Sequence, residues 1–267
     1  MSVVWFNSEF LYDTLPLDPA DRGLMLGDGL FETIAVAGGQ AIWLDEHIAR
    51  LVASATALDI SADEADLRVS IAKVLKRSNA LYEVLRVTLT RGVTQRGLAA
   101  DAHHSSLLIS LLPFDPAQQP QSLTFATSII RRNETAPSSR HKTLSYIDNV
   151  AAAREVKGKA DDALMLNTSG HVACSTVGNI FISQDGVLVT PRDDQGILQG
   201  ITRAKIFENA MFKTRQDIVT VDDLYSADAV FLTNSLRLVT PVTKLDDRTL
   251  GTASVQHIKD YLKGLSS

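Results

Sequence analysis

Ser138-Ser-Arg-His-Lys-Thr-Leu-Ser-Tyr-Ile-Asp-Asn149 places a single lysine, Lys142, between a polar loop and an apolar run. The pattern that follows predicts an amphipathic helix over residues 142–157, with the lysine at its start. A lysine at a helix edge is commonly a surface residue. The role of Lys142 therefore depends on what the rest of the chain supplies, above all a phosphate site and a substrate site.

The composition is that of an ordinary soluble globular protein. The chain has 267 residues, 45% of them hydrophobic and 21% charged, which suits one large domain or two small ones. A net charge of −5 without a basic stripe gives no reason to expect nucleic acid. No apolar run approaches the ~18 residues of a membrane span, and the N-terminus does not read as a signal peptide. We expect a cytoplasmic protein that binds neither nucleic acid nor a membrane.

The single cysteine, Cys174, rules out an internal disulfide framework and a multi-cysteine metal site. It also fits a reducing compartment. His103-His104 lacks further ligands, so no metal is expected. No Gly-x-Ser-x-Gly motif is present, which removes the usual hydrolase alternative.

The first part of the chain combines strand patterns with two helical ones. Apolar residues at helical spacing predict a helix that begins near Asp45, and Ser61-Ala-Asp-Glu64 predicts a capping box for a second helix. A strand or hairpin is predicted over residues 3–12, and strands over residues 30–36, 40–44, 84–90 and 106–112. Together they predict a small α/β domain over residues 1–114.

Asp115-Pro-Ala-Gln-Gln-Pro-Gln121 has no apolar periodicity and is predicted to be a linker. Beyond it, strands are predicted over residues 123–130, 163–167, 171–174, 179–183, 187–189 and 229–234, and helices over residues 142–157, 202–212 and 253–265. These elements predict a larger second domain, residues 122–267, that carries Lys142.

A candidate phosphate site lies in Gly196-Ile-Leu-Gln-Gly-Ile-Thr-Arg203, where two glycines precede a predicted helix. Glycine lets the backbone approach a ligand, and a helix start offers unpaired N–H groups. The Ile201 and Thr202 amides and the Thr202 hydroxyl are natural donors to a phosphate. By itself, such a pattern is more commonly an ordinary glycine loop with Thr202 as the helix N-cap.

Five segments occur in a characteristic order: Asp21-Arg-Gly…Gly27-Asp-Gly-Leu-Phe-Glu-Thr33, Glu46-His-Ile-Ala-Arg-Leu51, His141-Lys-Thr-Leu-Ser-Tyr146, Asn179-Ile-Phe181 and Gly200-Ile-Thr-Arg203. Over residues 5–241 the chain thereby resembles the class IV aminotransferase family of fold-type-IV pyridoxal-phosphate enzymes. That family includes branched-chain and D-amino acid transaminases and aminodeoxychorismate lyase. The resemblance implies an α/β (α+β) fold with a small N-terminal α/β domain and a larger C-terminal, mixed, β-barrel-like domain with helices. It also implies a cofactor in the cleft between the domains, and a homodimer.

The resemblance assigns roles around the cofactor, pyridoxal 5'-phosphate. Lys142 is its Schiff-base lysine, and Arg50 anchors the phosphate through its side chain. Ile201 and Thr202 donate amides to the phosphate, and Ser235 falls where the family has another donor. Without the resemblance, a surface salt bridge is the simpler interpretation of Arg50.

For the substrate, an amino acid or an aminodeoxychorismate-like compound, Phe31 takes the place of a family aromatic. Two family positions that are often basic or hydroxylated are Ala35 and Leu98 here. Arg96 is then the leading candidate for binding a substrate carboxylate. A solvated loop arginine is nearly as good an interpretation of Arg96.

Cys174 departs from the family, which normally has a glutamate five residues before the asparagine of Asn179-Ile-Phe181. That glutamate pairs with the pyridine nitrogen and keeps it protonated. A thiol with a reference pKa of ~8.5 is mostly neutral at pH 7 and cannot replace the carboxylate charge, so the electron sink is expected to be weaker. Cys174 can equally be a small buried hydrophobic residue.

Three functions stay open. The favoured one resembles aminodeoxychorismate lyase, which eliminates pyruvate and leaves 4-aminobenzoate for folate synthesis; the short chain, the Arg-Gly…Arg-Gly loop at 91–97 and Thr233-Asn-Ser-Leu before Thr240-Pro-Val242 support it. The second is a D-amino acid or branched-chain amino acid transaminase, against which Cys174 weighs modestly; Cys174 weighs against the lyase too, though less clearly. The third is a non-catalytic pyridoxal-phosphate-binding dimer, which the retained Lys142 disfavours.

Overall fold

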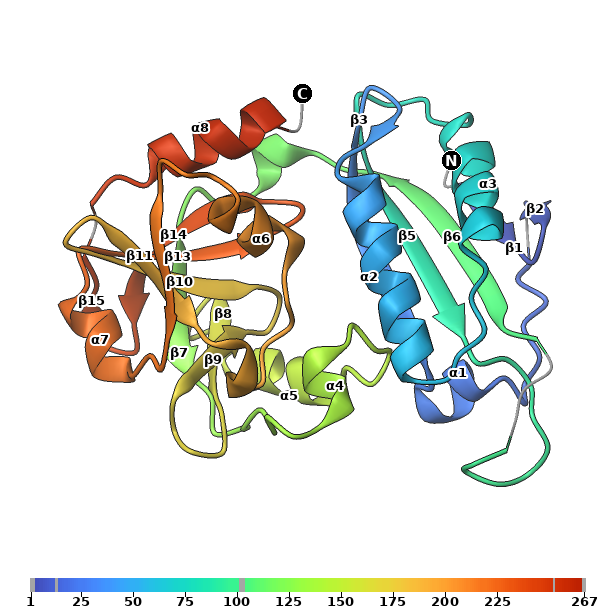
Figure 1. The fold of residues 1–267 in the computed structure, drawn as a ribbon, viewed down its shortest axis with the longest axis horizontal. Helices are drawn as coiled ribbons and strands as arrows, with labels where there is room; N and C mark the ends of the chain where they lie inside the picture. Colours follow the sequence, from blue (N-terminus) through green and yellow to red (C-terminus); the bar gives the residue numbers. More distant parts are fainter. Residues whose placement is uncertain (1–2, 13, 101–103, 252, 266–267) are drawn as a thin grey trace. The chain divides into compact units, whose positions relative to one another are not determined.

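The computed structural model describes residues 3–12, 14–100, 104–251 and 253–265 (Figure 1). Its N-terminal part is built on a six-stranded, antiparallel sheet in the order β2-β1-β6-β5-β3-β4. The strands are β1 (Val3–Phe6), β2 (Glu9–Leu11), β3 (Gly29–Ala37), β4 (Gln40–Ala41), β5 (Tyr82–Thr90) and β6 (Ser106–Pro113). The short helix α1 (Arg22–Leu26) precedes β3.

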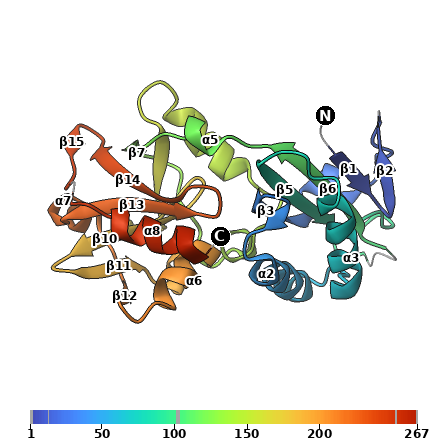
Figure 2. The ribbon, with the colours of Figure 1, turned by 90° about the horizontal axis from the view of Figure 1, so that it is seen from above.

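Two helices, α2 (Leu44–Ala57) and α3 (Glu64–Leu75), cover one face of this sheet (Figure 2). The first begins next to the predicted Asp45. The second is capped by Asp63, whose side chain accepts the Asp66 amide at 3.0 Å, so the predicted capping box at Ser61 is wrong. Asp63, and not Ser61, caps the helix because its short carboxylate side chain stands directly before the first helical residue and reaches the amide of the third.

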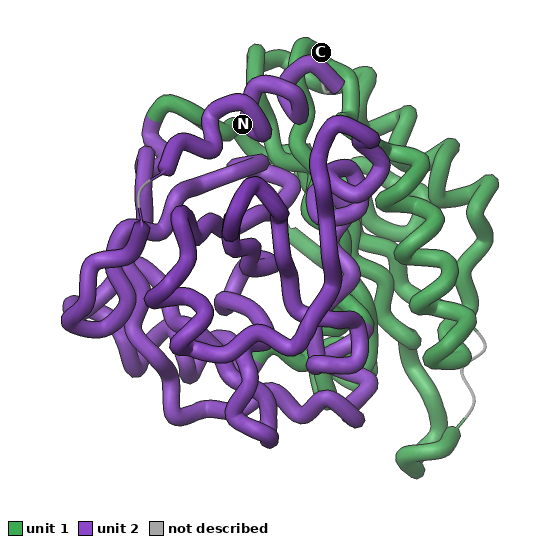
Figure 3. The backbone as a smooth tube through the Cα atoms, turned by 60° about the vertical axis from the view of Figure 1, so that its left-hand side comes forward, with its two compact units in different colours: residues 1–117, 141–146 green, residues 118–140, 147–267 purple. Residues whose placement is uncertain are grey.

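The backbone forms two compact units (Figure 3): unit 1 is Met1–Ala117 with His141–Tyr146, and unit 2 is Gln118–Arg140 with Ile147–Ser267. Lys142 thus belongs with the first unit, whereas the prediction gave it to the second domain. The reason is strand-like pairing with β3, because the Phe31 amide donates to the Lys142 carbonyl at 2.9 Å and the Leu144 amide to the Gly29 carbonyl at 2.8 Å. The same pairing makes the predicted helix over residues 142–157 start later, at Ile147.

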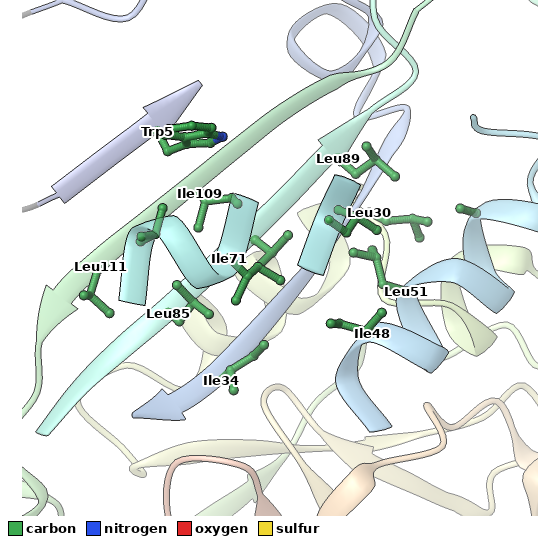
Figure 4. Packing of buried hydrophobic residues seen from close by; sticks show 14 of the residues in the cluster. Trp5, Leu30, Ile34, Ile48, Leu51, Ile71, Leu85, Leu89, Ile109 and Leu111 are labelled. Carbon is green, nitrogen blue, oxygen red and sulfur yellow. The ribbon is translucent and has the colours of Figure 1, made fainter. Parts of the chain in front are cut away.

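The core of unit 1 lies between the sheet and its two helices (Figure 4). Ile48 and Leu51 of α2 and Ile71 of α3 point toward Leu30 and Ile34 of β3. Alternate residues of β3 therefore face this core, as the period of two in an extended strand requires. Glu32 shares that inward face with its apolar neighbours, which makes it an exception that needs a partner.

Unit 2 contains a closed, mixed barrel of six strands. Its order is β10-β13-β14-β7-β8-β9, and Asn179 of β10 pairs with Cys174 of β9 to close the ring. The barrel strands are β7 (Leu123–Thr127), β8 (Asp162–Leu166), β9 (Val172–Ser175), β10 (Asn179–Gln184), β13 (Ala229–Asn234) and β14 (Leu238–Leu245); β11 (Val187–Pro191), β12 (Lys213–Asp217) and β15 (Arg248–Thr249) extend it. The predicted fold class, with a smaller α/β domain and a larger barrel-like one, is confirmed.

The helices of unit 2 are α4 (Pro137–Arg140), α5 (Ile147–Glu155), α6 (Ile201–Phe207), α7 (Val221–Ser226) and α8 (Gln256–Leu265). The helix predicted over residues 202–212 ends early, at Phe207. Beyond it the chain turns, and the Phe212 ring packs edge-on against His257 and Tyr261 of α8 at 5.9 and 5.4 Å. None of the helices in the described part of the chain has the length and apolar character needed to cross a membrane.

Candidate active site

The backbone around Lys142 is fixed against strand β3. Besides the two amide bonds to Phe31 and Gly29, Thr143 forms a bridge with Leu30. A Cβ atom on Gly29 would lie 2.8 Å from the Leu144 side chain and 2.6 Å from the Leu89 carbonyl oxygen, so only glycine allows this approach. Pairing with β3 thereby fixes the position from which the Lys142 side chain extends.

The Lys142 side chain lies next to two aromatic rings. Its Nζ atom is 4.3 Å from the centre of the Phe31 ring and 5.7 Å from that of Tyr146, and the two rings meet edge to face at 5.2 Å. Burial lowers the pKa of Lys142 to about 8, and the Arg50 and Arg86 charges add to this against the opposing charge of Glu32. Such an amine is about one tenth unprotonated at pH 7, several hundredfold more than an ordinary lysine. It is a nucleophile suited to an aldehyde.

A buried ionic cluster joins strand β3 to helix α2. Arg50 donates from Nε and Nη2 to the two carboxylate oxygens of Glu32 at 2.8 and 2.6 Å, and His47 Nδ1 lies 2.7 Å from Oε2. Burial alone would raise the pKa of Glu32, but the Arg50 charge and the bonds from His47 and Arg50 outweigh it and hold the pKa at about 2. For His47, burial has the opposite effect and lowers the pKa, so the ring is neutral and donates from Nδ1 to the Glu32 carboxylate. Arg50, the predicted phosphate anchor, thus forms a largely buried ion pair with Glu32 and not a surface salt bridge.

Arg86 of β5 is a site residue that the sequence analysis missed. It pairs across the sheet with Thr33, and its guanidinium carbon lies 3.5 Å from the centre of the Phe31 ring. Burial lowers the pKa of Arg86, against the opposing charges of Tyr146 and Glu32. The available signal was the alternation of β5, in which Arg86 is the charged residue on the face opposite Leu85, Val87 and Leu89.

The loop that carries Arg96 is held at its base by a second arginine. Arg22 donates from Nη1 to the Gly97 carbonyl and from Nη2 to the Leu98 carbonyl, both at 2.9 Å, and from Nε to Asp28 at 2.7 Å. The loop is therefore tied to α1, while the Arg96 side chain itself is exposed. The structure does not bring Arg96 into the cluster around Lys142.

In unit 2, the glycine loop before α6 has the features of an anion cradle. Gly200, not Thr202, is the N-cap of α6, and no side chain caps this helix. Asn179 Nδ2 donates to the Leu198 carbonyl at 2.8 Å, and a Cβ on Gly200 would lie 2.1 Å from Asn179 Oδ1. Thr202 is almost fully buried, yet its hydroxyl has no partner among the described residues. A buried hydroxyl without a partner is costly unless a ligand uses it.

Ser235 lies in the turn between β13 and β14. The side chain of Asn234 shapes this turn, because its Oδ1 accepts the Leu236 and Arg237 amides at 3.1 and 2.9 Å. The neighbouring Thr233 hydroxyl is buried and has no partner among the described residues, a feature that the sequence analysis missed.

Cys174 is buried in β9, in a small apolar cluster with Ala163 and Met165. Burial raises the pKa of its thiol, and the Asp162 charge adds to this while Arg132 opposes it. Cys174 is therefore a neutral thiol in an apolar setting. Arg132 itself binds a neutral acceptor, the side-chain oxygen of Asn149, at 3.1 Å.

These groups fit pyridoxal phosphate, the cofactor that the resemblance implies. Within unit 1, an amine of lowered pKa lies near a fixed guanidinium. Taken by itself, unit 2 has a glycine loop and the buried Thr202 hydroxyl, which has no partner among the described residues. No group of three metal-ligating side chains occurs among the residues that the structure describes; His103 lies outside them.

Comparisons with curated proteins give relatives of three activities. A Methanocaldococcus jannaschii protein assigned to the branched-chain-amino-acid aminotransferases is 32% identical over 97% of this chain and 93% of its own length. The aminodeoxychorismate lyase of Bacillus subtilis is 29% identical over 94% and 89%, and the D-alanine aminotransferase of Bacillus licheniformis is 30% identical over 89% and 86%. The relatives are thus split between transfer and elimination.

Solved structures agree with the fold. The branched-chain amino acid aminotransferase from Escherichia coli, 22% identical, superposes with a TM-score of 0.90 over 100% of this chain and 94% of its own. A hypothetical aminotransferase from Mycobacterium tuberculosis, solved in its PLP-bound form and 25% identical, reaches 0.87 over 99% and 98%. Residues 29–245 match the family described as Amino-transferase class IV, whose enzymes use pyridoxal phosphate. With this match across most of its length, the chain belongs to the class IV aminotransferase family.

Proposed function

We propose that the protein uses pyridoxal phosphate, carried by Lys142, to eliminate pyruvate from an aminodeoxychorismate-like substrate and leave 4-aminobenzoate. The observation that carries the cofactor assignment is the Lys142 amine, half-buried beside Phe31 with a pKa of about 8. An amine in this state attacks an aldehyde near neutral pH, whereas an ordinary lysine is almost wholly protonated.

Several hydrogen-bond donors would hold the cofactor phosphate. The Arg50 guanidinium, the Ile201 and Thr202 amides and the Thr202 hydroxyl are donors for a phosphate dianion. Ser235 supplies a further hydroxyl. When bound, the cofactor supplies an electron sink for the carbon that bears the amino group of the substrate.

Lys142 would act a second time, on the substrate. Its Nζ would be the base that takes a proton from the carbon bearing the amino group. Its lowered pKa suits this exchange near neutral pH, because a base of pKa about 8 is partly free and still basic enough to accept a proton. The Phe31 and Tyr146 rings limit access of water to Nζ.

Two arginines are candidates for the substrate carboxylate. Arg86 stacks on Phe31, close to Lys142, and its guanidinium has no carboxylate bound to it among the described residues. Arg96 is exposed in its loop. We propose that Arg86 binds a carboxylate near the reacting carbon and that Arg96 acts at the entrance to the site.

The choice of elimination over transfer is supported by Cys174. Its neutral thiol adds no charge that would keep a pyridine nitrogen protonated, and this weighs more against repeated transamination than against a single elimination. Transamination of branched-chain or D-amino acids is the second candidate, since relatives named for those activities are 32% and 30% identical.

A homodimer is also proposed, because apolar side chains gather on the surface of unit 1. Leu24, Met25 and Leu26 of α1 are 62%, 65% and 49% exposed. Contiguous exposed apolar surface marks interaction sites more often than solvent-facing ones. A double change, Leu24→Lys with Met25→Lys, is expected to lower the mass found by light scattering from two chains to one.

The activity test compares two sets of substrates with one preparation of enzyme. With aminodeoxychorismate, the proposal expects pyruvate and 4-aminobenzoate in equal amounts. With pairs of an amino acid and a keto acid, covering D-alanine and the branched-chain amino acids, it expects no exchange of the amino group. Fast exchange without pyruvate release from aminodeoxychorismate would replace the lyase by the transaminase.

A further inference from the structure

The carboxylate of Glu32 is the centre of the ionic cluster between β3 and α2. Both Glu32 and His47 are 1% exposed, so water does not compete for their polar atoms. His47 and Arg50 are three residues apart on α2, which puts them on one face of the helix, over the strand that carries Glu32. Three N–H groups of two side chains therefore converge on one carboxylate.

This cluster contributes little to the stability of the fold. Removing a carboxylate and a guanidinium from water costs several kcal/mol per ion, and apolar side chains of similar size often serve stability as well or better. The Nε2 atom of His47 is buried and has no partner among the described residues, which adds to the cost. A costly cluster next to a reactive lysine points to a role in function.

The bonds fix the plane of the Arg50 guanidinium. Arginine alone has several free torsions, and binding an anion would cost the entropy of ordering them. Two parallel bonds to Glu32 set the direction of the side chain in advance, and His47 in turn restrains the carboxylate. Second-layer partners of this kind typically change the affinity of a site 10–100-fold.

The cluster also balances charge at Lys142. The Arg50 and Arg86 charges disfavour a protonated lysine, and the Glu32 charge opposes them. Without Glu32, two guanidinium groups would face the lysine with no anion to offset them.

We propose that Glu32 and His47 are positioning residues, which hold the Arg50 guanidinium in the orientation that binds the cofactor phosphate and offset its charge at Lys142. This inference rests on the proposed function, in which Arg50 is the side-chain anchor of the phosphate. It assigns Glu32 and His47 an effect on phosphate binding although neither is expected to touch the phosphate.

The test measures how tightly the cofactor-free protein binds pyridoxal phosphate and pyridoxal, which lacks the phosphate. For Glu32→Gln, we expect about 10–100-fold weaker binding of pyridoxal phosphate and less than about threefold change for pyridoxal. His47→Gln should also weaken the binding of pyridoxal phosphate more than that of pyridoxal, but by a smaller factor. It takes the place of Glu32→Gln in the test if that variant does not fold. Glu83→Gln is the matched control, because Glu83 is another buried glutamate of the same sheet, bonded to Ser78; it should change neither affinity.

The variant Arg50→Ala distinguishes a failure of the positioning role from a failure of the proposed function, in which Arg50 anchors the phosphate. If Arg50→Ala loses affinity for pyridoxal phosphate selectively while Glu32→Gln and His47→Gln bind as the unaltered protein does, the positioning role is wrong and the anchor stands. Equal losses for both ligands in Glu32→Gln would mean a structural role only and would also overturn the inference. If Arg50→Ala leaves the ratio of the affinities for pyridoxal phosphate and pyridoxal unchanged, Arg50 is not the phosphate anchor, and the positioning role of Glu32 and His47 is wrong as well.

Discussion

The Lys142 ammonium lies 4.3 Å from the centre of the Phe31 ring, on an aromatic side chain that the Arg86 guanidinium also contacts, at 3.5 Å. Each cation is attracted to the ring, but the two repel each other, so besides burial the Arg86 charge helps to lower the pKa of Lys142. Since arginine does not lose its proton near neutral pH, lysine is the group that responds. Phe31 therefore keeps a reactive amine next to a permanent positive charge, which suits a site for anionic substrates.

Lys142 should make the free energy of unfolding of the cofactor-free protein depend on pH. Its pKa in the folded state, about 8, lies below the ordinary value of 10.5, so between these values the unfolded state binds more protons. The free energy of unfolding should therefore rise with pH across this window because of Lys142, and the penalty should be fully present below it. Urea denaturation of the unaltered protein and of Lys142→Met, at the two ends of the window, measures this. An identical pH dependence in both proteins would contradict the lowered pKa.

Thr202→Val should separate binding from stability. The Thr202 hydroxyl is buried without a partner among the described residues, so an isosteric methyl group should leave the cofactor-free protein as stable or up to about 1 kcal/mol more stable. Affinity for pyridoxal phosphate should fall by about tenfold, because one donor is lost. Thr190→Val is the control: its hydroxyl donates to the Ile180 carbonyl at 2.6 Å, so this change should cost stability and spare the ratio of pyridoxal phosphate to pyridoxal binding. The reverse pattern would refute the assignment of Thr202.

Gly200→Ala should disrupt the phosphate loop. The added Cβ would lie 2.1 Å from Asn179 Oδ1, so the asparagine has to move and release the Leu198 carbonyl. We expect at least tenfold weaker pyridoxal phosphate binding, measured by absorbance titration. Gly264→Ala, on α8, meets no atom within 4 Å and should be neutral or stabilising by about 1 kcal/mol. Unchanged cofactor binding in Gly200→Ala would mean that this loop does not hold the phosphate.

Cys174→Glu should restore a charge beside the pyridine nitrogen if Cys174 stands where the family has its glutamate. The Arg132 charge acts on the Cys174 side chain and would stabilise a carboxylate there. The nitrogen-15 chemical shift of labelled pyridoxal phosphate should then move toward that of a protonated ring, and transamination should rise. Cys174→Gln has the same size without the charge and should leave the shift as in the unaltered protein. If the glutamate and glutamine variants agree, Cys174 does not face the ring nitrogen.

Local patterns predicted those elements that local interactions determine. The alternation of apolar residues predicts a strand over residues 229–234, and β13 has those bounds. The helical spacing before Ala57 likewise predicts α2 almost to the residue. In both cases neighbours in sequence decide which face is buried.

Features that depend on distant pairing could not be predicted in this way. Lys142 leaves the predicted helix because residues 142–144 pair with β3, more than a hundred positions earlier in the chain. Closure of the barrel rests on one pairing, Asn179 with Cys174, that no periodicity encodes. The local alternation of β5 shows only that Arg86 stands opposite the apolar face, whereas its place in the site follows from its register with Thr33.

The central claim, that Lys142 carries the cofactor, is tested most directly by reducing the protein with borohydride in the presence of pyridoxal phosphate and mapping the labelled peptide by mass spectrometry. The account predicts one label, on Lys142, and a visible absorbance of the bound cofactor that Lys142→Ala abolishes. A label on another lysine, or the same absorbance in Lys142→Ala, would contradict it.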